Sequence, residues 1–115
     1  MAPSTPETPR LRALKPWRAT YDPALAVAAG DRVTPGQIDD AYPGWQWVVN
    51  SGGLGGWIPA AILEGDRTTI AFDTTELTVA MGDRLKPLDH RLGWTLCQTQ
   101  DGQTGWVPDH CLGTD

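Results

Sequence analysis

The sequence predicts an all-β protein made of two small β-barrels in tandem, joined by a short linker. Three observations lead to this fold class. The 115 residues include thirteen glycines and ten prolines, which interrupt helices but suit short strands joined by tight turns. Short runs of alternating apolar and small or polar residues lie between these turn residues. The second half of the chain also repeats motifs of the first half in the same order.

The internal similarity covers most of each half. Residues 24–33 recur as residues 76–85, with Leu, Val, Ala, Gly, Asp and Arg at matching places. A later motif, Gly-Trp-Ile-Pro at 56–59, recurs as Gly-Trp-Val-Pro at 105–108. The stretch between the two motifs is longer in the first half, and such a length change is what a surface loop tolerates. The sequence therefore indicates two copies of one fold.

Each copy is predicted to contain short strands in one order. A first strand leads through a Gly-Asp turn into a second, and a loop of variable length precedes a Trp-rich strand. Gly-Gly or Asp-Gly then forms a hairpin turn, and the last strand ends at a proline, which lacks the N–H that a β-ladder needs. In the first copy these strands are 25–27, 32 onward, 45–49 and 57–59; in the second they are 77–79, 84 onward, 94–99 and 106–108.

The domain organisation follows from the two copies. Residues 1–14 form a proline-rich tail that we expect to be disordered. Residues 15–64 form the first barrel and residues 65–115 the second, with a linker of residues 64–67. A barrel of this size buries little surface and is marginal alone, so we expect the two barrels to touch.

With the strands in this order, each copy resembles a Src-homology-3 (SH3) domain. The family has an Ala-Leu-Tyr-Asp-Tyr-like opening, a Glu-Leu-Ser-Phe-like strand, a Gly-Asp turn, a Trp-Trp strand and a Gly-Tyr-Ile-Pro-like ending. The corresponding segments here are 19–23, 25–33, 45 onward and 56–63 in the first copy, and 70–74, 77–85, 94 onward and 105–112 in the second. The whole chain is similar to bacterial tandem SH3 proteins.

The resemblance implies binding of a peptide, usually a proline-rich segment laid across aromatic ridges. Carried over to this sequence, it assigns aromatic residues and prolines to two ligand faces, with acidic residues of the variable loops beside them. The first face holds Tyr21, Trp45, Trp57 and Pro59 with Asp39 and Asp40; the second holds Phe72, Trp94, Trp106 and Pro108 with Asp89. The sequence departs from the family at Pro23, Thr74, Ile62 and Cys111, where tyrosines are usual, and in a shortened acidic hairpin.

The tryptophans have two possible roles. Trp45 and Trp94 are expected to expose their rings to a ligand, although packing against the other barrel or the tail is the alternative. Trp47 lies two residues after Trp45 and is expected to pack rather than to bind. Trp17 is expected to anchor the tail on a barrel.

No catalytic, metal or cofactor site is predicted. Cys97 and Cys111 are expected to be buried free thiols, with a disulfide as the lesser alternative. His90 and His110 each follow an aspartate, but no second closely spaced pair completes a metal site. Cys111 beside His110 is the one candidate nucleophile, and sequence neighbours rarely have the required geometry. We therefore expect a protein that is not an enzyme.

Charge and hydropathy limit the partners. The formal net charge of −5 argues against a nucleic-acid partner, because phosphate binding needs a basic face. No apolar run approaches the ~20 residues of a membrane span, and no signal-peptide pattern is present, so we expect a cytoplasmic location. Pro6 and Pro9, followed by Arg10 and Arg12, suggest docking of the tail on the chain's own barrels or in a homodimer.

The sequence therefore predicts a non-enzymatic module that binds a protein or peptide partner through aromatic faces, with proline-rich or basic segments as candidate ligands. The alternative is a structural or assembly protein, in which the aromatic faces are used between the two barrels or in a homodimer. Binding of cell-wall peptide is a third interpretation, which the acidic charge and the absence of a signal sequence disfavour.

Overall fold

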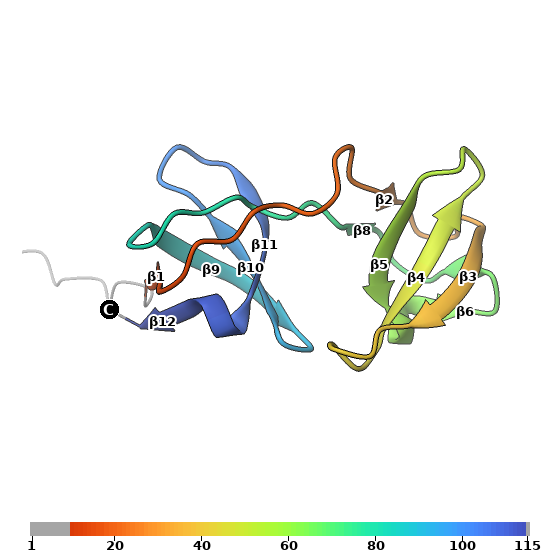
Figure 1. Ribbon diagram of the computed structural model, residues 1–115. Coiled ribbons are helices and arrows are strands. Elements are labelled where there is room, and N and C mark those ends of the chain that lie inside the picture. Colours follow the sequence, from red (N-terminus) through yellow and green to blue (C-terminus); the bar gives the residue numbers. More distant parts are fainter. Residues whose placement is uncertain (1–9, 115) are drawn as a thin grey trace, which may run out of the picture.

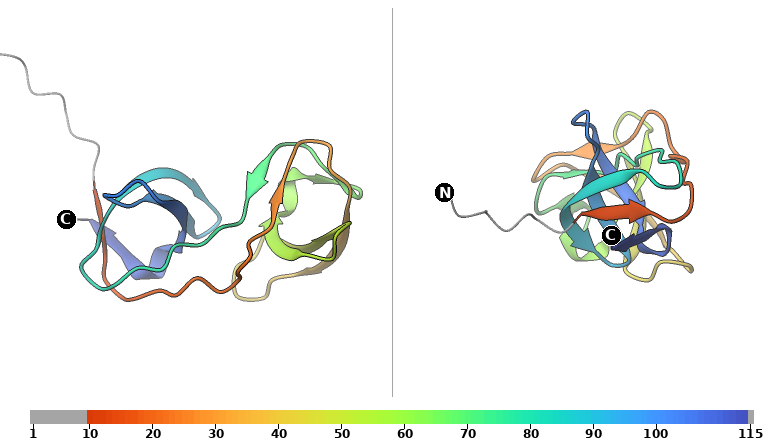
Figure 2. Two further views of the ribbon diagram at one scale, coloured as in Figure 1. Left: turned by 90° about the horizontal axis from the view of Figure 1, so that it is seen from above. Right: turned by 90° about the vertical axis from the view of Figure 1, so that its left-hand side faces the viewer.

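The computed structural model describes residues 10–114, and this part of the chain is all-β. It contains twelve short strands and two 3₁₀ turns, and no α-helix. The strands gather into two units that lie side by side (Figure 1). Seen from above, the strands of each unit curve around its interior (Figure 2). The all-β class predicted from the sequence is confirmed.

The second unit consists of residues 11–17 together with residues 77–114. An antiparallel meander of three strands leads through a 3₁₀ turn into a short final strand, and the N-terminal strand lies between this final strand and the meander. The sheet order is β11-β10-β9-β1-β12. The elements are β1 (Leu11–Ala13), β9 (Arg84–Arg91), β10 (Trp94–Gln98), β11 (Thr104–Pro108), η2 (Asp109–Cys111) and β12 (Leu112–Thr114).

The first unit consists of residues 25–73 and has the same plan. Its meander β3-β4-β5 is followed by a 3₁₀ turn and the hairpin β6-β7. A β-bridge between Arg32 and Arg67 places β7 beside the start of β3, where β1 lies in the second unit. The elements are β2 (Ala26–Val27), β3 (Val33–Ile38), β4 (Trp45–Asn50), β5 (Gly55–Pro59), η1 (Ala60–Ile62), β6 (Leu63–Glu64), β7 (Arg67–Thr68) and β8 (Phe72–Asp73).

The two units exchange the segments that precede them in the sequence, which we call their opening segments: residues 11–17 complete the second unit, and residues 67–73 complete the first. Strand β1 precedes the first unit in the sequence but pairs with β9 and β12 of the second. Strands β7 and β8 follow β6 in the sequence. Strand β7 pairs with β6, and β8 pairs with β2, so both belong to the first unit. Two crossover segments, residues 18–24 and 74–76, therefore run between the units, as Figures 1 and 2 show.

This exchange corrects the predicted domain boundaries. A division between residues 64 and 65 separates β7 and β8 from the unit in which they pair. The predicted disorder of residues 1–14 is also wrong for β1, because Ala13 is fully buried and bonded to the Gly-Asp turn at Gly82 and Asp83. Residues 1–9, with the Pro6 and Pro9 spacing, lie outside the described residues.

Each copy of the Gly-Asp pair forms the same turn. Gly30 has φ 87° and Gly82 has φ 92°, in the region that glycine adopts without steric cost. The carboxylate after each glycine accepts a hydrogen bond from a backbone N–H three residues before it, at 2.8 Å for Asp31 and 2.9 Å for Asp83. The turn predicted from the sequence is thus present in both units.

Two clusters of buried side chains form the interior. The first contains Leu25, Val48 and Ile58 of the first unit, and the second contains Leu77, Leu85 and Val107 of the second unit. Cys97 and Cys111 are both buried in the second cluster and carry free thiols. No helix among residues 10–114 is long and apolar enough to cross a membrane.

Candidate binding pocket

Strand alternation places the indole rings on the outer face of each unit. In β4 the side chain of Val48 is fully buried in the first cluster, so Trp45 and Trp47 point to the opposite face of the strand. In β11 the fully buried Val107 belongs to the second cluster, and its neighbour Trp106 points away from it. The rings therefore leave the interior of their own unit.

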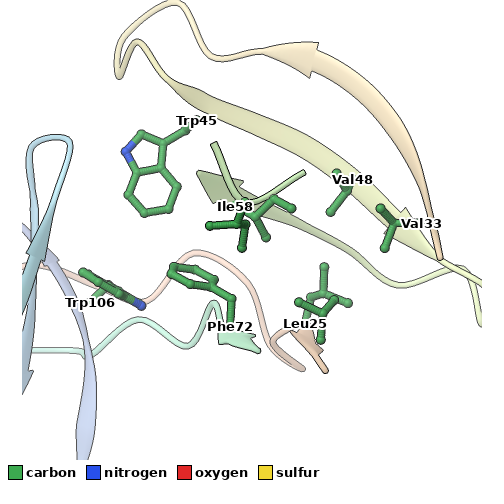
Figure 3. Close-up of a cluster of buried hydrophobic side chains, with 9 residues drawn as sticks. Leu25, Val33, Trp45, Val48, Ile58, Phe72 and Trp106 are labelled. Carbon is green, nitrogen blue, oxygen red and sulfur yellow. The ribbon is translucent and has the colours of Figure 1, made fainter. Parts of the chain in front are cut away.

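The outer faces of the two units are turned toward each other. The rings of Trp45 and Trp94 have centroids 6.4 Å apart, and those of Trp45 and Trp106 are 6.1 Å apart. Phe72 and Trp106 stack with centroids 5.5 Å apart and an interplanar angle of 21°. Figure 3 shows Trp45, Phe72 and Trp106 at the edge of the first cluster that faces the second unit. Trp106 is thus a strand residue of one unit that packs in the core of the other.

Hydrogen bonds join the units at the same place. The Nε1–H of Trp45 donates to the carbonyl oxygen of Leu92 at 2.9 Å. The Nε1–H of Trp106 donates to the carbonyl oxygen of Asp73 at 2.9 Å. The hydroxyl of Tyr42, whose ring packs against Trp94, lies 3.1 Å from Nε2 of His110. These contacts fix the distance between the two aromatic faces.

The crossover segments close one side of the junction. Trp17 and Val79 exchange two backbone hydrogen bonds, of 3.0 and 2.8 Å, so the two chain directions run antiparallel beside each other. The Nε1–H of Trp17 donates to Oε1 of Glu76 at 2.9 Å, and the hydroxyl of Thr20 donates to the same oxygen at 3.1 Å. Glu76 is thereby held at the junction.

A pocket of about 170 Å³ remains between the aromatic faces, and we call it the junction pocket. Eight aromatic residues, two carboxylates and two threonines line it. They are Trp17, Thr20, Tyr21, Asp39, Tyr42, Trp45, Trp57, Phe72, Thr74, Glu76, Trp94 and Trp106.

The charge in the junction pocket is negative. Asp39 accepts hydrogen bonds from the backbone N–H groups of Ala41 and Tyr42 at 2.7 and 3.2 Å, and Glu76 accepts from Trp17 and Thr20. These donors are neutral, and neither carboxylate forms an ion pair within residues 10–114. Burial, followed by the negative charges of Cys111, Asp39 and Glu76, raises the pKa of Tyr42.

Seven of the residues predicted as ligand contacts line the junction pocket. They are Tyr21, Asp39, Trp45, Trp57, Phe72, Trp94 and Trp106. The sequence analysis had divided them between two separate faces, whereas the structure brings them together in one pocket. The exchange of opening segments is the reason: Phe72 lies in the first unit, and Trp17 takes the equivalent place in the second.

The other four predicted contacts lie elsewhere. Pro59 and Pro108 are fully buried on the strands that pair with Trp45 and Trp94, so their predicted contact with a ligand is wrong. Asp40 is exposed and is not part of the pocket wall. Asp89 pairs with Arg91 at 3.4 Å, on the far side of Phe72 and Trp106 in a different hollow.

Trp45 is less exposed than expected. Only 5% of its surface is accessible, and its indole N–H is already bonded to Leu92. The expectation that it presents a free ring and a free donor to a ligand is therefore wrong, and the alternative of packing against the other unit applies. Trp47 packs as predicted, against Trp57 at 5.2 Å and Tyr21 at 5.4 Å.

Five residues of the pocket wall were not predicted as site residues: Trp17, Thr20, Tyr42, Thr74 and Glu76. Trp17 was expected to anchor the tail, and its ring instead lies 5.5 Å from that of Trp94 in the pocket wall. Tyr42 lies in the variable loop directly before the Gly-Trp motif, which is the signal that could have identified it. Glu76 occupies the place of Ala24 in the other copy, so the comparison of the two copies could have singled it out.

No cysteine or histidine among the described residues is part of the pocket wall. His90 Nε2 lies 2.6 Å from Asp109, which also accepts from the hydroxyl of Thr95 at 2.7 Å. Burial, with a smaller contribution from the charge of Asp109, raises the pKa of Cys97 to about 11. Burial also raises the pKa of Cys111, so both thiols are protonated and weakly nucleophilic near neutral pH. Within residues 10–114, no His, Cys, Asp and Glu side chains form a group that could hold a metal ion.

No family model matches this chain, and no curated protein matches it either.

Proposed function

We propose that the protein is a non-enzymatic binding module of two SH3-like units, and that the junction pocket holds a side chain of a protein or peptide partner. The junction pocket is the observation on which this proposal rests. Pockets that bind ligands are concave and mostly apolar, with a few polar groups that fix orientation, and the wall of the junction pocket has that composition.

The strand plan supports the SH3-like assignment. Both units contain a curved meander of three strands, a 3₁₀ turn after a buried proline and a short final strand beside the opening strand. The motifs that carry the resemblance fall on these elements in the family's order: the Gly-Asp turns precede β3 and β9, and the Trp strands are β4 and β10.

The position of the aromatic rings supports binding at the junction rather than on two separate faces. The rings that an SH3 ligand would cross are divided between units that face each other. An extended peptide that crosses one face would meet the opposite unit, so the pocket suits one side chain of a partner. Flat, rigid aromatic rings lose little conformational entropy when they enclose such a group.

One observation favours the alternative function, a structural or assembly protein. Trp45 and Trp106 are each 5% exposed, and both of their indole N–H groups are bonded within the chain. In this alternative the aromatic residues serve to hold the units together, and the pocket is a gap in their packing. The two functions differ in whether a partner's affinity depends on the pocket wall.

Selection of peptides from a displayed random library against the full chain tests the proposal. The variant Tyr21→Ala removes a ring that is 39% exposed at the pocket, so its effect on folding is expected to be small. Met81→Ala is the matched control, because Met81 is 73% exposed and lies outside the pocket wall. Loss of an aromatic contact of this kind typically costs about 2 kcal/mol or more, which corresponds to roughly a thirtyfold weaker affinity.

Selected peptides that bind the wild type and Met81→Ala equally, but bind Tyr21→Ala far more weakly, are the expected result. Selection of no peptide, or of peptides that bind all three proteins equally, would contradict the proposal. In that case a loss of stability in Trp94→Ala would favour the structural alternative.

A further inference from the structure

We infer that the junction pocket recognises an organic cation, namely a methylated or quaternary ammonium group. This inference rests on the proposed function and names the chemistry of the group that enters the pocket. Three properties of the pocket lead to it: its aromatic wall, its two carboxylates without a basic partner, and its size.

The aromatic wall is suited to a cation. The faces of Trp, Tyr and Phe rings carry partial negative charge, and several rings around one site attract a cation without hydrogen bonds. Trp17, Tyr42 and Trp94 form a continuous series at this wall, with centroid separations of 5.5 Å and 5.1 Å on either side of Trp94. Trp45 continues the wall from the other unit at 6.4 Å.

The two carboxylates supply charge complementarity. Asp39 comes from the variable loop of the first unit and Glu76 from a crossover segment, and both line the pocket. Each is half-buried, and its bonded donors are neutral groups. No Lys, Arg or His lines the pocket among the described residues. A neutral occupant would desolvate these carboxylates without compensation, whereas a cation offsets the loss of water.

A methylated ammonium suits the composition of the wall better than a primary ammonium does. A primary ammonium has three N–H donors and needs an acceptor for each when it leaves water. Eight of the twelve lining residues are aromatic, so most of the wall offers aromatic rings rather than oxygen acceptors. A quaternary ammonium has no N–H donor, so it lies against such a wall without an unsatisfied group.

The volume is that of a compact group. The junction pocket measures about 170 Å³, and a protein cavity of about 150 Å³ is large enough for a benzene molecule. A trimethylammonium group is a similarly compact object. The pocket therefore suits the end of one side chain or a small molecule.

Titration of the full chain with choline chloride tests the inference, with the indole N–H signals observed by NMR. The neutral control ligand is 3,3-dimethyl-1-butanol, in which a carbon replaces the nitrogen of choline and the shape is retained. We expect choline to shift the pocket tryptophan signals in a saturable manner and to bind about tenfold or more tightly than the neutral alcohol, because only choline gains cation–π and charge attraction. Equal affinities, or the absence of saturable shifts, would overturn the inference.

Two variants without the negative charge test whether the carboxylates contribute to binding of the cation. Glu76→Gln and Asp39→Asn keep the oxygen that accepts the observed hydrogen bonds but remove the charge. The control Glu64→Gln removes one charge at an exposed position outside the pocket wall. We expect the first two variants to weaken choline binding several-fold and the control to leave it unchanged. An equal effect of all three would show that only the overall charge matters, and would overturn the inference.

A second pair of ligands distinguishes the source of the cation. One short peptide contains a single trimethyllysine, and the other contains unmodified lysine at the same place. Tighter binding of the trimethyllysine peptide than of choline assigns the cation to a partner protein, and tighter binding of choline assigns it to a small molecule; both support the inference. If the pocket-dependent peptides of the library selection bind but show no preference for a cation, the inference fails while the proposed function stands.

Discussion

Gly56 and Gly105, which precede tryptophans in β5 and β11, have a packing role that the atoms around them explain. In β11, a Cβ atom on Gly105 would lie 2.8 Å from the backbone nitrogen of Leu77 and 2.9 Å from the carbonyl carbon of Glu76. In β5, a Cβ on Gly56 would lie 2.8 Å from Cβ of Leu25. The absence of a side chain therefore lets the segment that leads into each unit lie directly on the strand.

We expect Gly105→Ala to destabilise the protein, because the added methyl group meets backbone atoms that cannot move independently. Overpacking of this kind costs about 1–3 kcal/mol of unfolding free energy. The matched control is Gly52→Ala. This position is exposed, and the added Cβ would lie 3.4 Å from its nearest neighbour, Oδ1 of Asn50. Urea unfolding followed by tryptophan fluorescence measures both, and equal effects would contradict this account of Gly105.

The buried thiol of Cys97 makes stability sensitive to alkaline pH. The thiol has an ordinary pKa of 9.0, and in the folded protein its pKa rises to about 11. Between these values the unfolded chain loses the proton while the folded chain retains it, so the free energy of unfolding decreases as the pH rises through this window. The two pKa units correspond to about 2–3 kcal/mol, fully present below pH 9 and lost above pH 11.

Urea unfolding at several pH values from 8 to 11 measures this prediction. Cys97→Ala removes the titrating group, so we expect its stability to fall less steeply with pH than that of the wild type, even though its stability near neutral pH is lower. Cys111 retains its raised pKa in the variant and contributes the remaining slope in the same direction. Parallel curves for the two proteins would show that Cys97 does not titrate as described.

At the scale of elements, the opening strands decide which residues share a unit. Strand β1 is only three residues long, but it fills the gap between β9 and β12 with registered pairs on both sides. Without it, both neighbours would present unpaired backbone groups at an edge. The corresponding gap beside β3 in the first unit is filled by β7, which comes from the following segment of chain.

We expect Ala13→Asp to destabilise the second unit, although residue 13 precedes the first unit in the sequence. Ala13 is fully buried, with 0% of its surface accessible to water. A buried carboxylate without a partner costs about 3–5 kcal/mol. Lys15→Asp introduces the same side chain at an exposed position two residues later and is expected to have little effect.

Hydrogen exchange of the amides in β9 and β12 locates the effect of Ala13→Asp. Faster exchange in these strands than in β3 and β6 is the expected pattern, because β1 pairs only with the second unit. Faster exchange in the first unit alone would contradict the exchange of opening segments.

At the scale of the whole molecule, the two units depend on each other. A side-chain hydrogen bond from Thr20 to Glu76 joins the crossover segments, and Trp106 completes the core cluster of the unit to which its strand does not belong. The junction pocket exists only when both units are in place, since its wall takes residues from both and from the crossovers. Folding and ligand binding are therefore properties of the entire described chain.

We expect neither of two fragments, residues 1–64 and residues 65–115, to fold alone. The first lacks β7 and β8, and the second lacks β1. Amide NMR spectra of the separate fragments should show the narrow dispersion of unfolded chains, and an equimolar mixture should regain dispersed signals as the strands pair. A well-dispersed spectrum from either fragment by itself would contradict this interdependence.

The all-β class and the positions of the Gly-Asp turns can be read from the sequence alone. The turns depend on neighbours within a few residues, such as Gly30 with Asp31. Seven residues of the junction pocket were named from the resemblance to SH3 domains, because the motifs that carry the resemblance are local.

Three features follow from long-range packing: which unit each opening strand completes, the union of two predicted faces in one pocket, and the burial of Trp45. These depend on partners distant in sequence: Leu11 pairs with Thr114, and Trp45 packs against Trp94 and Trp106. A strand of two or three residues exposes the same backbone donors and acceptors to any neighbour, so its local sequence does not specify its partner. The packing of the whole chain selects it.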